Sequence, residues 1–134
     1  MEVEQIIKAA KLWRCTYWFP SNKRVGEDAS EYQMRAYQDG DTLILESTPN
    51  EEGSYMLVRL TIVDDVATGT WHETTSPGGE FKGALYNGSG QLVINPETYA
   101  MEGKWAGAGY DHKLKTMRVY AGNWEIDPIT EVKA

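Results

Sequence analysis

The segment from Tyr55 to Thr74, YMLVRLTIVDDVATGTWHET, decides the fold class of this chain. Its two halves, Tyr55 to Val63 and Val66 to Thr74, are rich in β-branched and aromatic residues, with a period of two. That period is typical of a strand with one buried face. Asp64-Asp65 is a two-residue turn signal of the kind that joins two strands tightly. The segment therefore predicts an antiparallel β-hairpin.

The same period of two runs through most of the chain on either side of this hairpin. It predicts about nine strands, at Leu12 to Phe19, Glu31 to Gln38, Thr42 to Thr48, Tyr55 to Val63, Val66 to Thr74, Glu80 to Tyr86, Gln91 to Asn95, Thr98 to Gly107 and Thr116 to Ile126. Further turn signals stand at Gln38-Asp39-Gly40-Asp41, Asn50-Glu51-Glu52-Gly53, Ser76-Pro77-Gly78-Gly79 and Asn87-Gly88-Ser89-Gly90. Successive strands joined by short turns form a meander, and closure of a meander removes its exposed edges. We therefore expect an all-β fold, an antiparallel up-and-down meander β-barrel of about eight to ten strands.

Two segments break this pattern. Glu2 to Ala10 places Val3, Ile6, Ile7 and Ala10 on one helical face, which predicts a short amphipathic N-terminal helix. Pro20 to Ala29 is polar and has no period, and we expect it to be a long loop over a mouth of the barrel. No stretch is long enough to be a linker, so residues 1–134 are interpreted as a single domain.

Composition argues against several classes of partner. The formal net charge is −7, with 13 Lys and Arg against 20 Asp and Glu. Nucleic acid is bound through clustered Lys and Arg, so we expect no nucleic-acid partner. No apolar run approaches the ~20 residues that span a bilayer, and the acidic start is unlike a signal peptide. The single cysteine, Cys15, fits a reducing compartment. We expect a cytoplasmic protein with no membrane partner.

Tryptophan and tyrosine dominate the aromatic residues, with five Trp and eight Tyr against two Phe. Rings that carry a polar atom need hydrogen-bond partners when buried, so they suit a half-polar cavity better than a dry core. Three tryptophans recur in a Gly-x-Trp pattern inside predicted strands, at Gly69-Thr70-Trp71, Gly103-Lys104-Trp105 and Gly122-Asn123-Trp124. Each Gly lets the strand bend or a neighbour approach, and the Trp two positions later, on the same face, fills the enclosed space. The three rings are then either core packing or the walls of a ligand site.

We assign the Gly-Trp faces of these three strands to the interior of the barrel. In the first strand, the face with Trp13, Cys15, Tyr17 and Phe19 is also assigned inward. Glu46, Arg59, Tyr86 and Gln91 are polar residues in patterned strands, and any that point inward would need a partner or a ligand. The candidate ligand-binding residues are Trp13, Tyr17, Glu46, Arg59, Trp71, Glu73, Tyr86, Gln91, Trp105, Tyr120 and Trp124.

Together these features resemble the calycin superfamily of lipocalins, fatty-acid-binding proteins and avidins. The shared features are Gly-x-Trp within strands, a meander, a short terminal helix and a length of 134 residues. The stretch from Gly69 to Pro77, followed by Gly83-Ala84, Tyr86 and Gln91-Leu92, is also similar to uncharacterised bacterial proteins, some of which join it to a helix-turn-helix. The calycin resemblance implies a binding site inside the barrel.

Motifs for other chemistry are sparse. His72 and His112 are the only imidazoles, and neither lies at ligand spacing from the other or from Cys15, so we expect no metal site and no cofactor. Acid–base catalysis stays open, because a barrel that buries Glu, Arg and Tyr can shift a carboxyl pKa and transfer protons, as some calycin-like decarboxylases and cyclases do. Glu73, Arg59 and Tyr17 would be the catalytic residues, with Glu46 and Tyr86 as further candidates.

We expect a non-catalytic barrel that binds a small, partly polar, aromatic or flat molecule. Trp71, Trp105 and Trp124 would form its walls. Glu73, Arg59 and Tyr17 would orient the ligand. Two alternatives stay open: a barrel enzyme of the decarboxylase, cyclase or isomerase type, and a protein-interaction module that lends a surface to a partner such as a transcriptional regulator. A homodimer formed through a barrel face is compatible with each of them.

Overall fold

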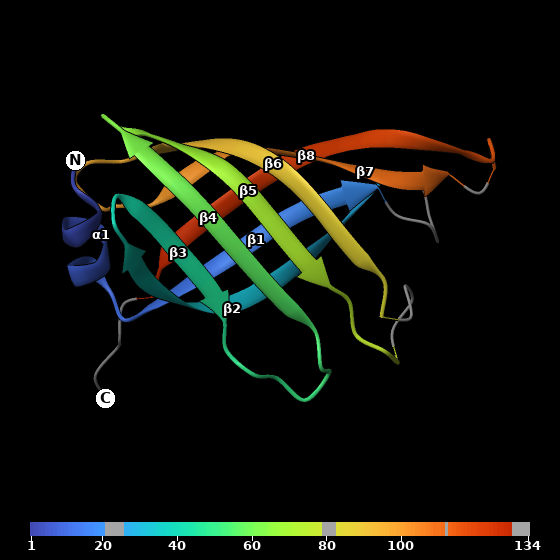
Figure 1. The fold of residues 1–134 in the computed structure, drawn as a ribbon, viewed down its shortest axis with the longest axis horizontal. Coiled ribbons are helices and arrows are strands. Elements are labelled where there is room, and N and C mark those ends of the chain that lie inside the picture. The colour runs from blue at the N-terminus through green and yellow to red at the C-terminus, as the bar shows by residue number, and fades with distance from the viewer. Residues whose placement is uncertain (21–25, 79–82, 112, 130–134) are drawn as a thin grey trace.

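Eight antiparallel strands close into a barrel in the computed structural model, which describes residues 1–20, 26–78, 83–111 and 113–129 (Figure 1). The strands are β1 (Leu12–Pro20), β2 (Glu27–Asp39), β3 (Thr42–Ser47), β4 (Tyr55–Val63), β5 (Val66–Thr74), β6 (Leu85–Ile94), β7 (Met101–Asp111) and β8 (Thr116–Pro128). Each strand pairs with the next, and β8 returns to β1, where Cys15 lies opposite Ile126. The predicted up-and-down meander and its closure are confirmed.

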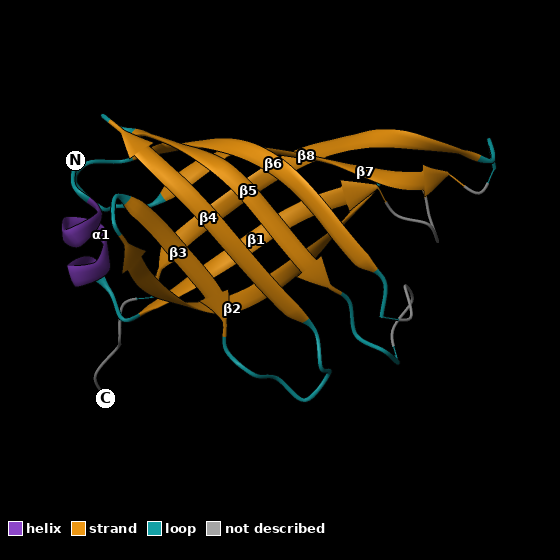
Figure 2. Cartoon of the chain, in the orientation of Figure 1, coloured by secondary structure: helices purple, strands orange, loops and turns teal. Residues whose placement is uncertain are grey.

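The helix α1 (Val3–Ala9) lies at one end of the barrel (Figure 2). It begins where the backbone N–H of Glu2 donates a 2.8 Å hydrogen bond to Oε1 of Gln5, which satisfies one of the free donors of a helix start. Val3 and Ile6 are buried, and Ile6 is completely enclosed. The predicted amphipathic helix is therefore confirmed, and its apolar face covers this end.

Apolar side chains fill the part of the barrel that adjoins α1. They alternate along the strands as a period of two requires: in β4, Val58 and Leu60 are fully buried while Arg59 between them is exposed. The largest fully buried side chains are Trp13, Trp124, Ile6, Met34, Leu43, Leu45, Leu60, Leu92, Ile94, Met101, Ile126 and Val58. Val3 and Ile6 of α1 belong to the same core cluster, so helix and barrel share one core.

The predicted turns at three positions connect strands as expected. Val63 pairs with Val66 across Asp64-Asp65, and Asp64 adopts a φ of +54°, the left-handed conformation that a two-residue hairpin favours. Gly40 and Gly53 also adopt positive φ, in the β2–β3 and β3–β4 turns. These residues determine the turns through backbone conformation rather than through packing.

The predicted turn at Asn87-Gly88-Ser89-Gly90 is wrong, because these residues lie in the middle of β6. Gly88 and Gly90 face the interior, where the tryptophan rings need space. A Cβ atom on Gly88 would collide with the ring of Trp71, and one on Gly90 would lie 2.5 Å from Cζ3 of Trp124. The two predicted strands on either side of this stretch therefore form one continuous strand from Leu85. Residues 79–82, which belong to the predicted Ser76–Gly79 turn and Glu80–Tyr86 strand, lie outside the described residues.

Two further boundaries differ from the prediction. Thr98 to Ala100 do not begin a strand, because Tyr99 has a φ of +66° and its N–H donates to the carbonyl oxygen of Asn95, which places it in the β6–β7 turn. The loop expected from Pro20 to Ala29 is shorter, because Glu27 to Ala29 pair with Trp18 to Pro20 as part of the β1–β2 ladder. Residues 21–25 lie outside the described residues.

The β7–β8 hairpin projects beyond the rest of the barrel, at the end away from α1 (Figure 1). Its ladder continues to Asp111 opposite Thr116, whereas the described β6–β7 ladder stops at Gly88 opposite Gly107. Its exposed large apolar side chains are Tyr110, Leu114, Met117 and Val119.

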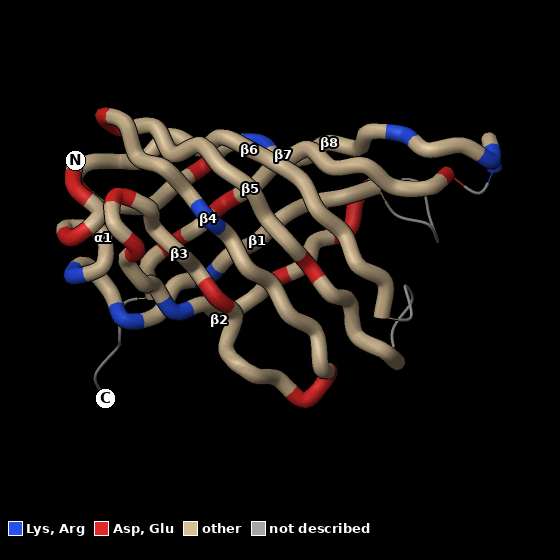
Figure 3. Tube along the Cα trace, viewed as in Figure 1, with Lys and Arg blue, Asp and Glu red and all other residues tan. Residues whose placement is uncertain are grey.

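Basic and acidic residues are interspersed along the strands and turns (Figure 3). Within the described residues, no helix has the length and apolar character needed to cross a bilayer.

Candidate functional site

A cavity of about 160 Å³ lies in the part of the barrel away from α1. Its lining comes from the far ends of β1, β5 and β7 and from the first residues of β6 and β8. The lining residues are Tyr17, Phe19, Pro20, Trp71, Glu73, Thr75, Tyr86, Trp105, Gly107, Ala108, Gly109, Tyr110 and Tyr120. The lumen is thus packed next to α1 and hollow at the opposite end.

Trp71, Trp105 and Tyr17 form the aromatic wall of this cavity. The rings of Trp71 and Trp105 meet edge to face, with centroids 5.7 Å apart at 87°. Tyr17 meets Trp105 in the same way, at 5.9 Å and 80°. Offset and edge-to-face arrangements of this kind are the favourable ones for aromatic pairs. Below them, Met56 and Trp124 join the same three rings around a gap of only about 10 Å³, which is about the smallest volume that holds one water molecule.

Hydrogen bonds within the protein hold the indole rings in place. Nε1 of Trp105 donates to the carbonyl oxygen of Trp18 at 2.8 Å, and Nε1 of Trp71 donates to that of Ser89 at 3.2 Å. Nε1 of Trp124 donates to the sulfur of Cys15 at 3.2 Å. Trp71 and Trp124 are thereby tied to adjacent strands, and Trp105 of β7 is tied to β1 across β8. The cavity is therefore formed before any ligand arrives.

Glycines on other strands provide the room for these rings. A Cβ atom on Gly107 would lie 2.5 Å from Cζ2 of Trp71. One on Gly122 would collide with the backbone oxygen of Trp18 and would also lie 2.8 Å from Nε1 of Trp105. Gly69 and Gly103 act differently, because a Cβ atom there would collide with the backbone of the adjacent strand. Close approach of a side chain, one of the roles expected of the Gly-x-Trp glycines, is confirmed at Gly122, whereas Gly69 and Gly103 allow the close approach of a strand backbone, which was not predicted.

Glu73 is the buried carboxylate of the cavity, with only 5% of its surface exposed. The phenol hydroxyls of Tyr17 and Tyr32 each donate a 2.6 Å hydrogen bond to its Oε2 atom. Short bonds to an ionised acceptor are among the stronger hydrogen bonds in proteins. The three side chains come from β1, β2 and β5, so closure of the barrel brings them together.

The tyrosines around Glu73 are held in their protonated form. Burial is the main cause that raises the pKa of Tyr17 and of Tyr32, and the negative charge of Glu73 and its hydrogen bonds raise both further. Burial and then Glu73 likewise raise the pKa of Tyr86, which lies opposite Glu73 on β6. The phenols therefore remain hydrogen-bond donors at neutral pH.

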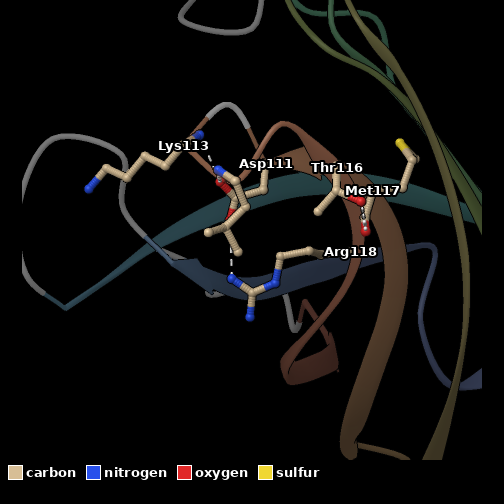
Figure 4. Close-up of polar contacts among 6 residues, drawn as sticks. Asp111, Lys113, Thr116, Met117 and Arg118 are labelled. Carbon is tan, nitrogen blue, oxygen red and sulfur yellow. Dashed lines mark hydrogen bonds and ion pairs between the residues drawn. The ribbon is translucent and has the colours of Figure 1, made fainter.

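At the rim, Arg118 of β8 forms an ion pair with Asp111 of β7, with Nη1 3.1 Å from Oδ2 (Figure 4). The backbone N–H of Leu114 and the guanidinium of Arg118 hold the pKa of Asp111 below its usual value. The guanidinium carbon of Arg118 also lies 5.7 Å from the ring centroid of Tyr120, within cation–π range. A ring that lines the cavity is thus already in contact with a cation on the protein itself.

The structure brings six of the predicted site residues together around the cavity: Tyr17, Trp71, Glu73, Tyr86, Trp105 and Tyr120. Trp13 and Trp124 also point inward, but they are fully buried in the core and do not line this cavity. Trp71, Trp105 and Trp124 point inward from their strands as predicted, and so does the Trp13–Phe19 face of β1. Arg118, on the Gly-Trp face of β8, is instead exposed at the rim.

The predicted site placement is corrected for three residues, because the structure places Glu46, Arg59 and Gln91 on the outer face of the barrel. Each alternates with inward residues: Arg59 stands between buried Val58 and Leu60, and Gln91 is exposed next to buried Leu92. Glu46 accepts a 2.7 Å hydrogen bond from the hydroxyl of Tyr55 on the adjacent strand, and the side-chain amide of Gln91 donates to Thr68. Glu46 and Gln91 therefore have partners without a ligand, and Arg59 is exposed on the outer face, away from the cavity.

Tyr32 is the important residue that sequence reasoning missed. It lies two positions before Met34 on the inward face of β2 and opposite Cys15 on β1. Because residues two apart in a strand share a face, Tyr32 points into the barrel if Met34 does. Its bond to Glu73, however, joins strands that are not neighbours in the sheet, and it follows only from closure of the barrel.

The remaining reactive side chains are not part of the cavity. Burial raises the pKa of the Cys15 thiol from 9.0 to about 12. His72 is on the outer side of β5, where Nδ1 forms a hydrogen bond with Oδ1 of Asn87. Among the residues that the structure describes, no three His, Cys, Asp or Glu side chains gather as metal ligands. His112 lies outside the described residues.

Comparison with known proteins gives no relative: no family model, no curated protein and no solved structure matches this chain. The eight-stranded closed meander is consistent with a calycin-like fold. A fold of this kind does not define a function, which depends on the residues of the cavity.

Proposed function

We propose that this protein is a small-molecule-binding β-barrel whose ligand enters the aromatic cavity. The observation that carries the proposal is the combination of rigid ring walls, Trp71 and Trp105, with one buried carboxylate, Glu73, around a preformed hollow. Ligand sites in proteins are typically concave, mostly apolar and furnished with a few polar groups. Barrels of about eight strands have an interior that holds side chains or one small ligand.

The volume of the cavity limits the ligand to a compact molecule. An engineered cavity of about 150 Å³ in another protein binds benzene, and the cavity here is about 160 Å³. We therefore propose a ligand with one or two rings, or a flexible body of similar size. Edge and face contacts with Trp71 and Trp105 would supply most of its affinity.

Titration of the intrinsic tryptophan fluorescence with a panel of one-ring and two-ring compounds tests this function. At least one compound is expected to change the emission saturably. Trp105→Ala, which removes one wall, is expected to weaken that binding by about tenfold or more. Trp13→Phe is the matched control, because Trp13 is buried outside the cavity. Equal affinity in the Trp105 and Trp13 variants would contradict the proposal.

A second candidate function is proton-transfer catalysis in the same cavity. The observation that favours it is the pair of phenols, Tyr17 and Tyr32, converging on the carboxylate of Glu73. Groups of this kind can relay a proton to or from a bound molecule. The predicted third member, Arg59, is absent from the cavity, so the chemistry would rely on Glu73 and tyrosines alone. Turnover of a bound compound that Glu73→Gln abolishes, with binding retained, would favour this candidate.

A further inference from the structure

The electrostatic character of the cavity limits what it can hold. Among the described residues that line it, Glu73 is the only Asp, Glu, Lys, Arg or His. The other lining side chains are aromatic, aliphatic or hydroxyl groups, or are absent because the residue is glycine. The described lining thus offers one negative charge and no positive charge of its own.

Donor groups of the walls are already engaged inside the protein. The indole N–H groups of Trp71 and Trp105 bond to backbone carbonyl oxygens, and the phenol of Tyr17 donates to Glu73. What these walls present to a ligand is therefore their ring surfaces, which are electron-rich, together with an acceptor carboxylate. Anions find no positively charged side chain in the described lining.

The carboxylate of Glu73 has hydrogen-bond support, but within the described part of the chain no basic side chain forms an ion pair with it. Both phenols bond to Oε2, so Oε1 is not engaged by them. Nearby basic residues on the described strands point elsewhere: Arg59 is exposed on the outer face of β4, and Arg118 is paired with Asp111 at the rim. A carboxylate in a water-poor site is stabilised strongly by a positive partner, and a buried charge without one is costly.

We infer that the ligand is a small organic cation, an amine in its ammonium form, whose N–H groups donate to Glu73 and whose body lies against Trp71 and Trp105. This inference rests on the proposed binding function and names its ligand class. Aromatic rings grouped with a carboxylate attract ammonium groups through the ring quadrupole and the charge together. The contact of Arg118 with the ring of Tyr120 is an instance of the same attraction at the rim.

Three probes of nearly equal size test the charge preference: benzylamine, benzyl alcohol and benzoate. Binding is followed by ¹H–¹⁵N NMR of the indole N–H resonances of the wild-type protein at pH 7. Benzylamine is expected to bind at least about tenfold more tightly than benzyl alcohol, and benzoate most weakly. This comparison needs no variant, so it does not depend on whether a substitution folds.

Glu73→Gln then tests the origin of the preference. It keeps a carbonyl acceptor for the tyrosines but removes the charge, and it is expected to reduce benzylamine affinity by about tenfold while leaving benzyl alcohol nearly unchanged. Glu102→Gln removes the same charge from an exposed position of β7 and is expected to change neither. Benzyl alcohol or benzoate binding as tightly as benzylamine would overturn the cation inference and leave the binding function standing. Absence of saturable binding by all three probes would overturn both.

Discussion

Tyr32 and Glu73 are 41 residues apart in the chain, and the phenol hydroxyl of Tyr32 donates a 2.6 Å hydrogen bond to Oε2 of Glu73 inside the barrel. Tyr17 donates to the same atom from β1. The carboxylate therefore links β5 to two strands on the other side of the lumen. This link both stabilises the closed barrel and presents a fixed, charged acceptor to the cavity.

Removal of either phenol is expected to destabilise the fold. Tyr32→Phe and Tyr17→Phe each delete one charge-assisted hydrogen bond, which is worth about 1.5–3 kcal/mol. Urea denaturation measures the loss of unfolding free energy. Tyr37→Phe is the control, since Tyr37 is 46% exposed and on the outer face. If Tyr32→Phe is no more destabilising than Tyr37→Phe, the hydrogen bond does not contribute as the geometry implies.

Gly107→Ala is expected to destabilise the protein through the ring of Trp71. The new Cβ atom would lie 2.5 Å from Cζ2 of Trp71, and overpacking of this kind costs about 1–3 kcal/mol. Trp71→Leu should remove most of that cost, because the obstacle is a side chain. A double-mutant cycle in urea measures the coupling.

Gly103→Ala provides the contrast for that cycle. Its Cβ atom would meet the backbone of Gln91 and Leu92, with the Cα of Leu92 at 2.7 Å. Since no side-chain truncation relieves a backbone collision, the effects of Gly103→Ala and Trp71→Leu should simply add. Equal rescue of both glycine variants by Trp71→Leu would contradict the distinction between ring space and strand approach.

Cys15 is expected to be unreactive in the folded protein. Its thiol is fully buried, and burial raises its pKa to about 12, so the nucleophilic thiolate is scarce at pH 8. A chromogenic disulfide reagent should label it only as fast as the barrel unfolds, and at once in concentrated urea. Rapid labelling of the native protein would show that β1 opens locally.

Stability is expected to fall at alkaline pH. The Cys15 thiol has a pKa of 9.0 when unfolded and about 12 when folded, so above pH 9 the unfolded chain releases a proton that the folded chain keeps. The unfolding free energy should then decrease by up to about 1.4 kcal/mol per pH unit from this group. Tyr17 and Tyr32, whose pKa values are also raised, add to the fall above pH 10. Urea denaturation from pH 8 to pH 10 should show a shallower decrease for Cys15→Ala, and an unchanged slope would refute the assignment.

Trp124→Phe is expected to destabilise the barrel more than Trp13→Phe. Both side chains are buried, but Nε1 of Trp124 donates to the sulfur of Cys15, whereas Nε1 of Trp13 has no hydrogen-bond partner among the described residues. Replacing Trp13 removes an unsatisfied donor, which offsets part of the packing loss. Thermal unfolding of the two variants measures their losses of stability. A larger loss of stability for Trp13→Phe than for Trp124→Phe would indicate that packing alone, and not the hydrogen bond to Cys15, sets the loss.

Much of the fold follows from the chain read alone. Period two in segments such as Tyr55–Val63 requires one buried face, so the inward direction of Trp71, Trp105 and Trp124 could be predicted from the Gly-x-Trp spacing. The same alternation, applied strictly, also places Arg59 outside, between Val58 and Leu60. Arg59 was predicted to be a site residue because a guanidinium can orient a ligand, although the alternation along the strand places it on the outer face.

Local sequence by itself determined the strands, the short helix and the tight hairpin at Asp64-Asp65, because backbone conformation and alternation act within a few residues. Only the tertiary structure decided that Asn87-Gly88-Ser89-Gly90 is a strand and that Tyr32 and Tyr17 meet Glu73. A glycine that turns the chain and a glycine that makes room for a ring look alike until the ring is in place. The distance across a closed barrel depends on all eight strands at once, so the meeting of Tyr17 and Tyr32 at Glu73 has no local signature.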